Sequence, residues 1–502
     1  FIQLRRYSLL SNDKQNTYFI TTPIFYVNSV PHIGHLYSAI IADTFHRFHR
    51  ICGKTNTTFS TGTDEYGIKI QRAAQLRGIE TKLFCDQISQ QFRSLFESSD
   101  IGFTHFIRTT DDLHRNSVQT FWTTLVNNGF IYKSSYEGWY CVSDETFVTE
   151  TQTFINENNI RVSTESGNAV EWSSEENYIF KLSQFKDKIV DWINSGDTVQ
   201  PSVFAHILRH EVEKGLRDIS VSRPKGRVNW GIEVPNDSEQ VIYVWFDALI
   251  NYLTVSGYPG DKNHIWPPDC QVIGKDILKF HGIYWPAFLM AAGLEPPHSL
   301  LCHSHWLRDD IKMSKSKGNV VDPFQCIKDY TSDGFRYFLL RQGSLHTDSN
   351  FTELNVKKYL NAELADNFGN LLSRCTAKAI NKSQMFPNLS LNDLLIVENE
   401  SSKLIEMIQN LAQNCENHYL NGNFHLVIND IMDCLRMNNI FFNETKPWLL
   451  AKQDNEFLRL QSVLCITLEA LRVESIVRNA IGLMPKRPSA QIVVLIRRQP
   501  LL

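Results

Sequence analysis

The chain has 502 residues, of which 42% are hydrophobic and 21% are charged, and its formal net charge is −4. This length is too great for one ordinary hydrophobic core and predicts roughly two to four domains. The composition excludes a disordered chain. No apolar run approaches the roughly 20 residues that span a bilayer. Because the net charge is small, any contact with nucleic acid must use local basic patches.

The first residues have the composition of a targeting segment. Arg5, Arg6 and two serines precede the first acidic residue, Asp13. Mitochondrial transit peptides have this bias, so residues 1–16 are interpreted as a transit-peptide remnant or a disordered start. We therefore expect the protein in the mitochondrial matrix, with the cytoplasm as the alternative. The 10 cysteines include no C-x-x-C pair, which is typical of a reducing compartment.

Residues 17–115 alternate short β-branched runs with longer runs of helical periodicity. This alternation predicts the first half of a Rossmann-type α/β domain. A buried strand is expected over residues 18–25 and a second strand over residues 55–61. Between them, apolar residues recur at helical spacing over residues 36–51, so a helix is expected to end near Gly53.

Composition and hydrophobic periodicity divide the rest of the chain into segments. Residues 116–237 are polar, aromatic-rich and irregular, and are interpreted as an insertion before the second Rossmann half at 238–308. Residues 309–360 link this domain to residues 361–484, where three-to-four spacing predicts a helical bundle. Residues 485–502 break the helical pattern and receive no role. The predicted fold class is an α/β Rossmann-type domain split by an insertion and followed by an α-helical bundle.

A first motif, His32-Ile-Gly-His35, lies between the predicted strand and the predicted helix. Backbone amides and the helix dipole favour phosphate at such a place, and Gly34 admits a close neighbour. The motif predicts a phosphate and adenine site. Two histidines one helical turn apart can equally be surface or core residues, so this motif alone does not decide between the alternatives.

A second motif, Lys312-Met-Ser-Lys-Ser316, is more specific, with a chance expectation on the order of one in ten thousand. Its alternative is a solvated lysine-rich loop. The two motifs, in this order and around a split nucleotide fold, resemble the signature of class I aminoacyl-tRNA synthetases. Adenylate formation needs positioned cations and donors around the phosphates, a task for His32, His35, Lys312 and Lys315 as catalytic groups.

The nucleotide site is expected to include a third segment. Gly274-Lys275-Asp276 follows a strand-like run, and the carboxyl ends of parallel strands line such sites, although a plain tight turn is the alternative. The expected ATP-binding residues are His32, Gly34, His35, Gly274, Lys275, Asp276, Lys312, Met313, Ser314, Lys315 and Ser316.

Four further segments, residues 22–28, 61–65, 243–252 and 280–286, are similar to methionyl-tRNA synthetases of the mitochondrial type. The resemblance implies activation of L-methionine with ATP and its transfer to tRNA(Met). It implies a methionine site formed by Ile24, Phe25, Tyr26, Asp64, Trp245, Ala248, Tyr252, Ile277 and His281, with Asp64 pairing the substrate ammonium. Aromatic rings suit a polarisable thioether, although without the resemblance Trp245 and Tyr252 would be read as core residues.

In the helical third, Asn370, Arg374 and Trp448 match the anticodon-reading segments of that family. Single-stranded bases are read by stacking and by hydrogen bonds to their edges, which these side chains can supply. Asn370 and Arg374 are four residues apart and share one helix face. Helix capping or a salt bridge is the alternative for this pair.

The insertion departs from many members of the family. Those members carry zinc knuckles of paired cysteines, but Cys141-Val-Ser-Asp144 keeps one cysteine and residues 150–172 have none. A structural zinc needs four nitrogen or sulfur ligands as a rule. We therefore expect no metal site and no structural zinc, and we expect Mg²⁺ to enter with ATP. The expected partners are tRNA(Met), L-methionine and ATP, with no membrane, and the protein is expected to be a monomer.

Two rival functions are disfavoured by the sequence. Another class I synthetase would share both motifs, but an insertion of about 120 residues is too short for the editing domain that selectors of small apolar side chains require. A catalytically inactive RNA-binding relative would be expected to have lost signature histidines or lysines, and none is lost.

Overall fold

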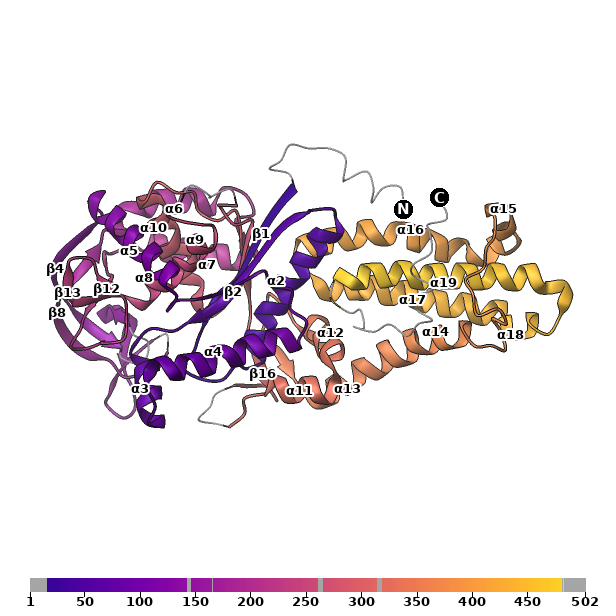
Figure 1. The fold of residues 1–502 in the computed structure, drawn as a ribbon, viewed down its shortest axis with the longest axis horizontal. Coiled ribbons are helices and arrows are strands. Elements are labelled where there is room, and N and C mark those ends of the chain that lie inside the picture. Colours follow the sequence, from indigo (N-terminus) through magenta and orange to yellow (C-terminus); the bar gives the residue numbers. More distant parts are fainter. Residues whose placement is uncertain are drawn as a thin grey trace.

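The computed structural model describes residues 16–141, 146–164, 166–260, 265–313, 318–480 and 482. Residues 1–15 of the expected transit segment and the whole tail at 485–502 lie outside this part. Figure 1 shows a layered α/β body at one end of the molecule and long, side-by-side helices at the other.

A six-stranded parallel sheet forms the centre of the α/β body. Its order is β3-β2-β1-β14-β15-β9. The strands are β1 (Thr17–Tyr26), β2 (Asn56–Asp64), β3 (His105–Arg108), β9 (Val199–Gln200), β14 (Cys270–Gly274) and β15 (Leu300–His303). The chain runs outward from β1 to β2 and β3 on one side and from β14 to β15 on the other. The order therefore reverses between β1 and β14, and a crevice opens at the carboxyl ends of strands at such a point.

The first strand and the helix after it arise as the sequence predicts. β1 reads TYFITTPIFY, a β-branched and aromatic run typical of a strand covered on both faces, and Ile20 pairs with both Phe59 and Cys270. Helix α2 (Ile33–Ile51) then buries its apolar stripe against β1 and β2. Together with α3 (Ile68–Arg77) and α4 (Thr81–Ser98), it covers one face of the sheet. These elements confirm the predicted strands and helix.

The other face is covered by α5 (Asp112–Asn127), α8 (Val244–Leu249), α9 (Asn251–Val255) and α10 (Trp285–Ala291). The segment predicted as an insertion forms small antiparallel sheets, β10-β8-β4-β5, β11-β13-β12 and β6-β7. Their strands are β4 (Ile131–Cys141), β5 (Thr146–Val148), β6 (Thr153–Ile155), β7 (Arg161–Ser163), β8 (Glu171–Phe180), β10 (Ile219–Ser220), β11 (Ser222–Pro224), β12 (Glu233–Val234) and β13 (Asp237–Ile242).

One part of the predicted insertion belongs to the central sheet. Strand β9, between α6 (Lys186–Ile193) and α7 (Ser202–Glu213), pairs in parallel with β15, with Leu300 opposite Val199. The predicted segment 116–237 therefore contains most strands of the small sheets and an edge strand of the large one, and its boundary at 237 falls on the first residue of β13.

A small sheet, β17-β16-β18, lies next in the chain and is formed by β16 (Trp306–Arg308), β17 (Ile311–Lys312) and β18 (Ser349–Phe351). The helical part begins between β17 and β18 and continues after β18. Its helices are α11 (Pro323–Tyr330), α12 (Ser332–Gln342), α13 (Glu353–Tyr359), α14 (Asn370–Cys375), α15 (Leu391–Leu394), α16 (Glu398–Leu420), α17 (Phe424–Thr445), α18 (Pro447–Leu450) and α19 (Phe457–Ala480). A π-helical stretch, Leu360–Gly369, joins α13 to α14. The predicted helical bundle is confirmed.

A buried charge pair ties α2 to the helical part. The Asp43 carboxylate on α2 forms an ion pair with Arg336 on α12, and both side chains are almost fully excluded from solvent. Arg47 and the backbone N–H of Gly102 donate to the same carboxylate at 2.6 and 2.8 Å. Removing one partner of such a pair leaves a buried charge uncompensated. Within the described residues, no helix is both long and apolar enough to cross a membrane.

Candidate functional site

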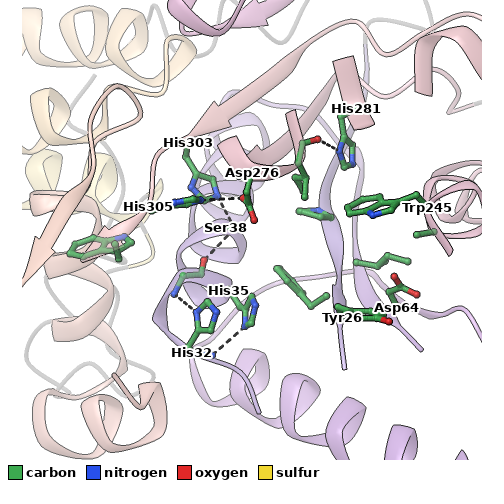
Figure 2. Close-up of a pocket in the computed structure, with 18 of the residues that line it drawn as sticks. Tyr26, His32, His35, Ser38, Asp64, Trp245, Asp276, His281, His303 and His305 are labelled. Carbon is green, nitrogen blue, oxygen red and sulfur yellow. Dashed lines mark hydrogen bonds and ion pairs between the residues drawn. The ribbon is translucent and has the colours of Figure 1, made fainter. Parts of the chain in front are cut away.

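A cavity of about 540 Å³ opens at the carboxyl ends of β1, β2, β14 and β15. Figure 2 shows the side chains that face it. Every residue expected to bind methionine lines this one cavity, and so do most of those expected to bind ATP: His32, Gly34, His35, Gly274, Asp276, Lys312 and Met313. The folded chain thus brings together residues from about 24 to about 313 in the sequence.

The start of α2 forms one wall of the cavity (Figure 2). Nδ1 of His32 accepts a hydrogen bond from the backbone N–H of Gly34 at 3.1 Å, and Nδ1 of His35 accepts one from the backbone N–H of His32 at 3.2 Å. Because both Nδ1 atoms are acceptors, the proton of each neutral ring is on Nε2. A Cβ atom at Gly34 would lie 2.9 Å from Cε1 of His32, so this cap requires glycine.

A buried histidine, which the sequence analysis did not single out, supports this wall. Nε2 of His303, at the end of β15, lies 2.7 Å from the Ser38 hydroxyl on α2, and its Nδ1 lies 2.9 Å from the carbonyl oxygen of Ser304. Burial lowers the pKa of His303 to about 4. The ring is therefore neutral, with Nδ1–H donating to the carbonyl and Nε2 accepting from Ser38. Its place at the end of a parallel strand was the signal that could have identified it.

The residues at the end of β14 and just after it lie partly in the cavity lining and partly beside it. Gly274 and Asp276 line the cavity, whereas Nζ of Lys275 forms an ion pair with Asp348 at 2.6 Å. Asp348 also accepts the backbone N–H of His305 at 2.9 Å, and Nε2 of His305 lies 3.2 Å from Oδ1 of Asp276. The ion pair with Asp348 therefore keeps Lys275 beside the cavity and not in its lining.

The lysine-rich motif follows a short hairpin beside the same cavity. β17 pairs with β16 and ends at Lys312, and both Lys312 and Met313 line the cavity. Ser314, Lys315 and Ser316 lie outside the described residues.

The opposite end of the cavity is aromatic, with Trp245 of α8 and Tyr26 of β1 among its lining side chains (Figure 2). Trp245 stacks on Phe280 with ring centroids 3.8 Å apart. The Tyr252 hydroxyl lies 2.8 Å from Nε2 of His281, and Nδ1 of His281 lies 3.0 Å from the carbonyl oxygen of Ile277. Burial lowers the pKa of His281 to about 4, so its neutral ring donates from Nδ1 and accepts from Tyr252 at Nε2. These side chains form an apolar pocket with a fixed polar pair at its base.

A carboxylate and an ammonium group lie near this aromatic end. Asp64 ends β2 with 8% of its surface exposed, and its Oδ1 accepts the backbone N–H of Tyr66 at 3.5 Å. Lys69 on α3 also lines the cavity, with Nζ 5.8 Å from the centroid of the Tyr26 ring. The sequence analysis missed Lys69, because nothing in its local pattern separates it from other helical lysines.

The residues expected to read the anticodon lie far from the cavity, at the outer end of the helical part, where Figure 1 places α14 and α18. The Arg374 guanidinium lies 5.6 Å from the ring of Trp448 and 4.9 Å from that of Phe442, and it donates to Asn443 at 2.7 Å. Trp448 is 38% exposed, and Asn370 is exposed one turn before Arg374. The fold therefore brings Arg374 and Trp448 together beside an exposed amide.

Only the first residue of the Cys141-Val-Ser-Asp144 segment, the remnant of a zinc-binding motif, is described by the structure. Cys141 is buried at the end of β4, and Asp144 lies outside the described part. Among the residues that the structure describes, no three His, Cys, Asp or Glu side chains are grouped as metal ligands would be.

The sequence and the fold are similar to known proteins. The family model described as "tRNA synthetases class I (M)" matches residues 18–376. The chain is 47% identical to the mitochondrial methionine–tRNA ligase of Xenopus laevis over 483 residues, covering 95% of this chain and 85% of that protein. It is 45% identical to the mitochondrial methionine–tRNA ligase of Homo sapiens, over 91% of this chain and 80% of that one.

A solved structure shares the whole architecture. The methionyl-tRNA synthetase of Mycobacterium tuberculosis in complex with methionyl-adenylate superposes with a TM-score of 0.87 and 34% sequence identity, and the match covers 93% of this chain and 91% of that one. The similarity therefore extends over both the α/β body and the helical part.

Proposed function

The chain belongs to the methionyl-tRNA synthetase family of class I enzymes, and we propose that the cavity at the carboxyl edge of its central sheet is where methionine is activated. As a methionine–tRNA ligase, it joins L-methionine and ATP into methionyl-adenylate with release of pyrophosphate, and then transfers methionine to tRNA. The observation that carries the proposal is that one cavity is lined by residues of both signature motifs and by the complete set of expected methionine-binding residues.

The start of α2 and the lysine-rich loop serve the phosphates. The methionine carboxylate attacks the α-phosphorus in line, and negative charge grows on the bridging and leaving oxygens. His32 and His35 can donate from Nε2 at a helix N-terminus, and Lys312 and Lys315 supply positive charge. ATP enters as its Mg²⁺ complex, and adenylation needs no general base because the attacking group is already a carboxylate.

The aromatic end serves the methionine side chain. Trp245 and Tyr252 can contact the thioether and its methyl group, and His281 fixes the direction of the Tyr252 hydroxyl. Asp64 pairs with the substrate ammonium. Its 8% exposure supports this role, because a carboxylate sheltered from water interacts more strongly with a cation than an exposed one.

The partner nucleic acid is tRNA(Met), read at its anticodon by Asn370, Arg374 and Trp448. Their support is geometric: an exposed indole with a guanidinium against it offers a stacking surface and hydrogen-bond donors to single-stranded bases. The relatives named mitochondrial support a location in that organelle. We further propose that the protein works in the mitochondrial matrix, that it contains no structural zinc, and that it is a monomer.

The direct test is ATP–pyrophosphate exchange with a panel of amino acids. Exchange should depend on methionine and be weak with leucine, isoleucine, valine and cysteine. Exchange that prefers another amino acid would assign the site to another class I synthetase, and no exchange at all alongside tRNA binding would favour an inactive RNA-binding relative. Elemental analysis of the same preparation should find no stoichiometric zinc.

The role of Asp64 has its own test. Asp64→Ala should nearly abolish methionine activation, because removing one partner of a buried, hydrogen-bonded ion pair typically costs ~3 to 5 kcal/mol. Methionine analogues without the amino group should bind the wild type weakly and lose little more in the variant, which is the coupling expected of a direct contact. Equal losses for methionine and for these analogues would make Asp64 a structural loop residue.

A further inference from the structure

The methionine end of the cavity depends on two short helices that are separated in the chain only by Ile250. Helix α8 carries Trp245 and Ala248, and helix α9 carries Tyr252. With six and five residues, respectively, neither helix is long enough to be stable by itself. Their relative orientation at Ile250 therefore has to be set by contacts from elsewhere in the fold.

A single buried histidine contacts both helices. His114 belongs to α5 and is 0% exposed. Its Nε2 lies 2.7 Å from Oδ1 of Asp247 on α8, and its Nδ1 lies 3.0 Å from the hydroxyl oxygen of Thr254 on α9. One ring therefore contacts both helices, through residues that flank Ile250 on either side.

Both ring nitrogens of His114 have a hydrogen-bond partner. Nε2 contacts the Asp247 carboxyl group, and Nδ1 contacts the Thr254 hydroxyl, which can either donate or accept. The ring is therefore joined to both helices by hydrogen bonds.

We propose that His114 is a positioning residue for methionine: by bridging Asp247 and Thr254, it sets the angle between α8 and α9 and so the distance across the pocket from Trp245 to Tyr252. This inference rests on the proposed methionine site. His114 itself is not among the residues that line the cavity, so it acts through the two helices and not on the substrate.

The contacts of His114 with α8 and α9 should affect the binding of methionine and not that of ATP. The expected ATP-binding residues within the described part lie at the start of α2, around the end of β14 and around the end of β17, and none lies on α8 or α9. A displacement of about 1 Å in a substrate-positioning group can cost on the order of 10²-fold in rate. Loss of the bridge is therefore expected to appear in the Michaelis constant for methionine and not in that for ATP.

The experiment measures both Michaelis constants by ATP–pyrophosphate exchange. His114→Ala should raise the KM for methionine about tenfold or more and change the KM for ATP less than about twofold. Ser117→Ala is the matched control, because Ser117 is on the same helix, is equally buried, and donates to the carbonyl oxygen of Tyr258 beyond α9 at 2.8 Å. It should lower stability without changing either KM.

Asp247 provides a rescue that a merely structural role would not give. In Asp247→Asn, the side-chain amide can either donate to Nε2 of His114 or accept from it, so the bridge survives and the KM for methionine should stay within a few-fold of the wild type. In Asp247→Ala, the bridge is lost and the KM should rise as in His114→Ala. If His114→Ala does not fold, the difference in the KM for methionine between Asp247→Asn and Asp247→Ala still tests the inference.

Two outcomes would overturn the inference: equal changes in both KM values, or an Asn variant at 247 as impaired as the Ala variant. A wild-type enzyme that shows no methionine-dependent exchange would instead overturn the proposed function. The wild-type measurement and the variant measurements thus separate the two failures.

Discussion

The Tyr252 hydroxyl donates to Nε2 of His281 across a distance of 2.8 Å, and this bond joins α9 to the segment after β14 at the base of the methionine pocket. Tyr252→Phe keeps the ring but leaves the buried Nε2 acceptor of His281 without this donor. We expect a loss of about 1 to 3 kcal/mol in the free energy of unfolding and a raised KM for methionine. Urea denaturation and pyrophosphate exchange measure the two effects.

Tyr258→Phe is the control for this change. The Tyr258 hydroxyl makes a long contact of 3.4 Å with Thr124, so removing it should cost little. If both variants behave alike, the bond between Tyr252 and His281 has no special importance for methionine.

The neutral histidines predict a dependence of stability on pH. Burial lowers the pKa of both His281 and His303 to about 4, below the ordinary value of about 6.5. Between these two pH values, the unfolded chain binds protons that the folded chain does not. The stabilisation is therefore complete above about pH 6.5 and is lost as the pH falls toward 4, by up to ~3 kcal/mol for each group.

Unfolding free energies measured in urea at intervals from pH 7.5 to 4.5 should show this slope, and His303→Gln should reduce it. Carboxylates with a lowered pKa, such as Asp43, titrate below this window and do not contribute within it. An unchanged slope in the variant would show that His303 is protonated in the folded protein.

The donors at the start of α2 should act on the rate of adenylation. His35→Ala removes an Nε2–H donor and should lower kcat for exchange by about 10²-fold or more, while the KM for methionine stays nearly constant. Arg50→Ala, an exposed change in the last turn of the same helix, is the control and should be close to neutral. A rise in KM for methionine with an unchanged kcat would contradict the assignment of His35 to the phosphates.

The outer end of the helical part should act on tRNA and not on adenylation. Trp448→Ala removes a stacking surface that is typically worth ~1 to 3 kcal/mol per base, which corresponds to roughly 5-fold to 150-fold weaker binding. Aminoacylation of tRNA(Met) should fall by that factor, with pyrophosphate exchange unchanged. Phe457→Ala, another exposed aromatic of the helical part, is the control, and an equal loss there would remove the case for a specific anticodon contact.

Elements with strong periodicity could be predicted from the sequence, and those without it could not. β1 and α2 each present many consecutive residues with a single pattern, so their positions follow from local sequence. β9 has two residues, and its strand conformation depends on pairing with β15, about 100 residues later. No local signal distinguishes such a segment from a loop.

The same limit applies to the site. The motif residues His32 and Lys312 are recognisable in short segments, but the support from His303 and His114 depends on partners 265 and more than 130 residues away in the sequence. These residues come into contact only through the tertiary structure, when the helices pack on the sheet, so the local sequence does not identify the pairs. The pairing of Lys275 with Asp348 across 73 residues likewise depends on tertiary structure.

The pairing of β1 with β14 has a consequence for how the chain is made. Ile20 is opposite Cys270, and the backbone N–H of Phe19 donates to Asp269, a contact across 250 residues. During synthesis, one edge of β1 therefore stays open until more than half of the chain has been made. Open strand edges associate with other chains, and pairings across long loops form slowly. We expect shortened chains that end before Cys270 to aggregate, and refolding of the full chain to depend on protein concentration.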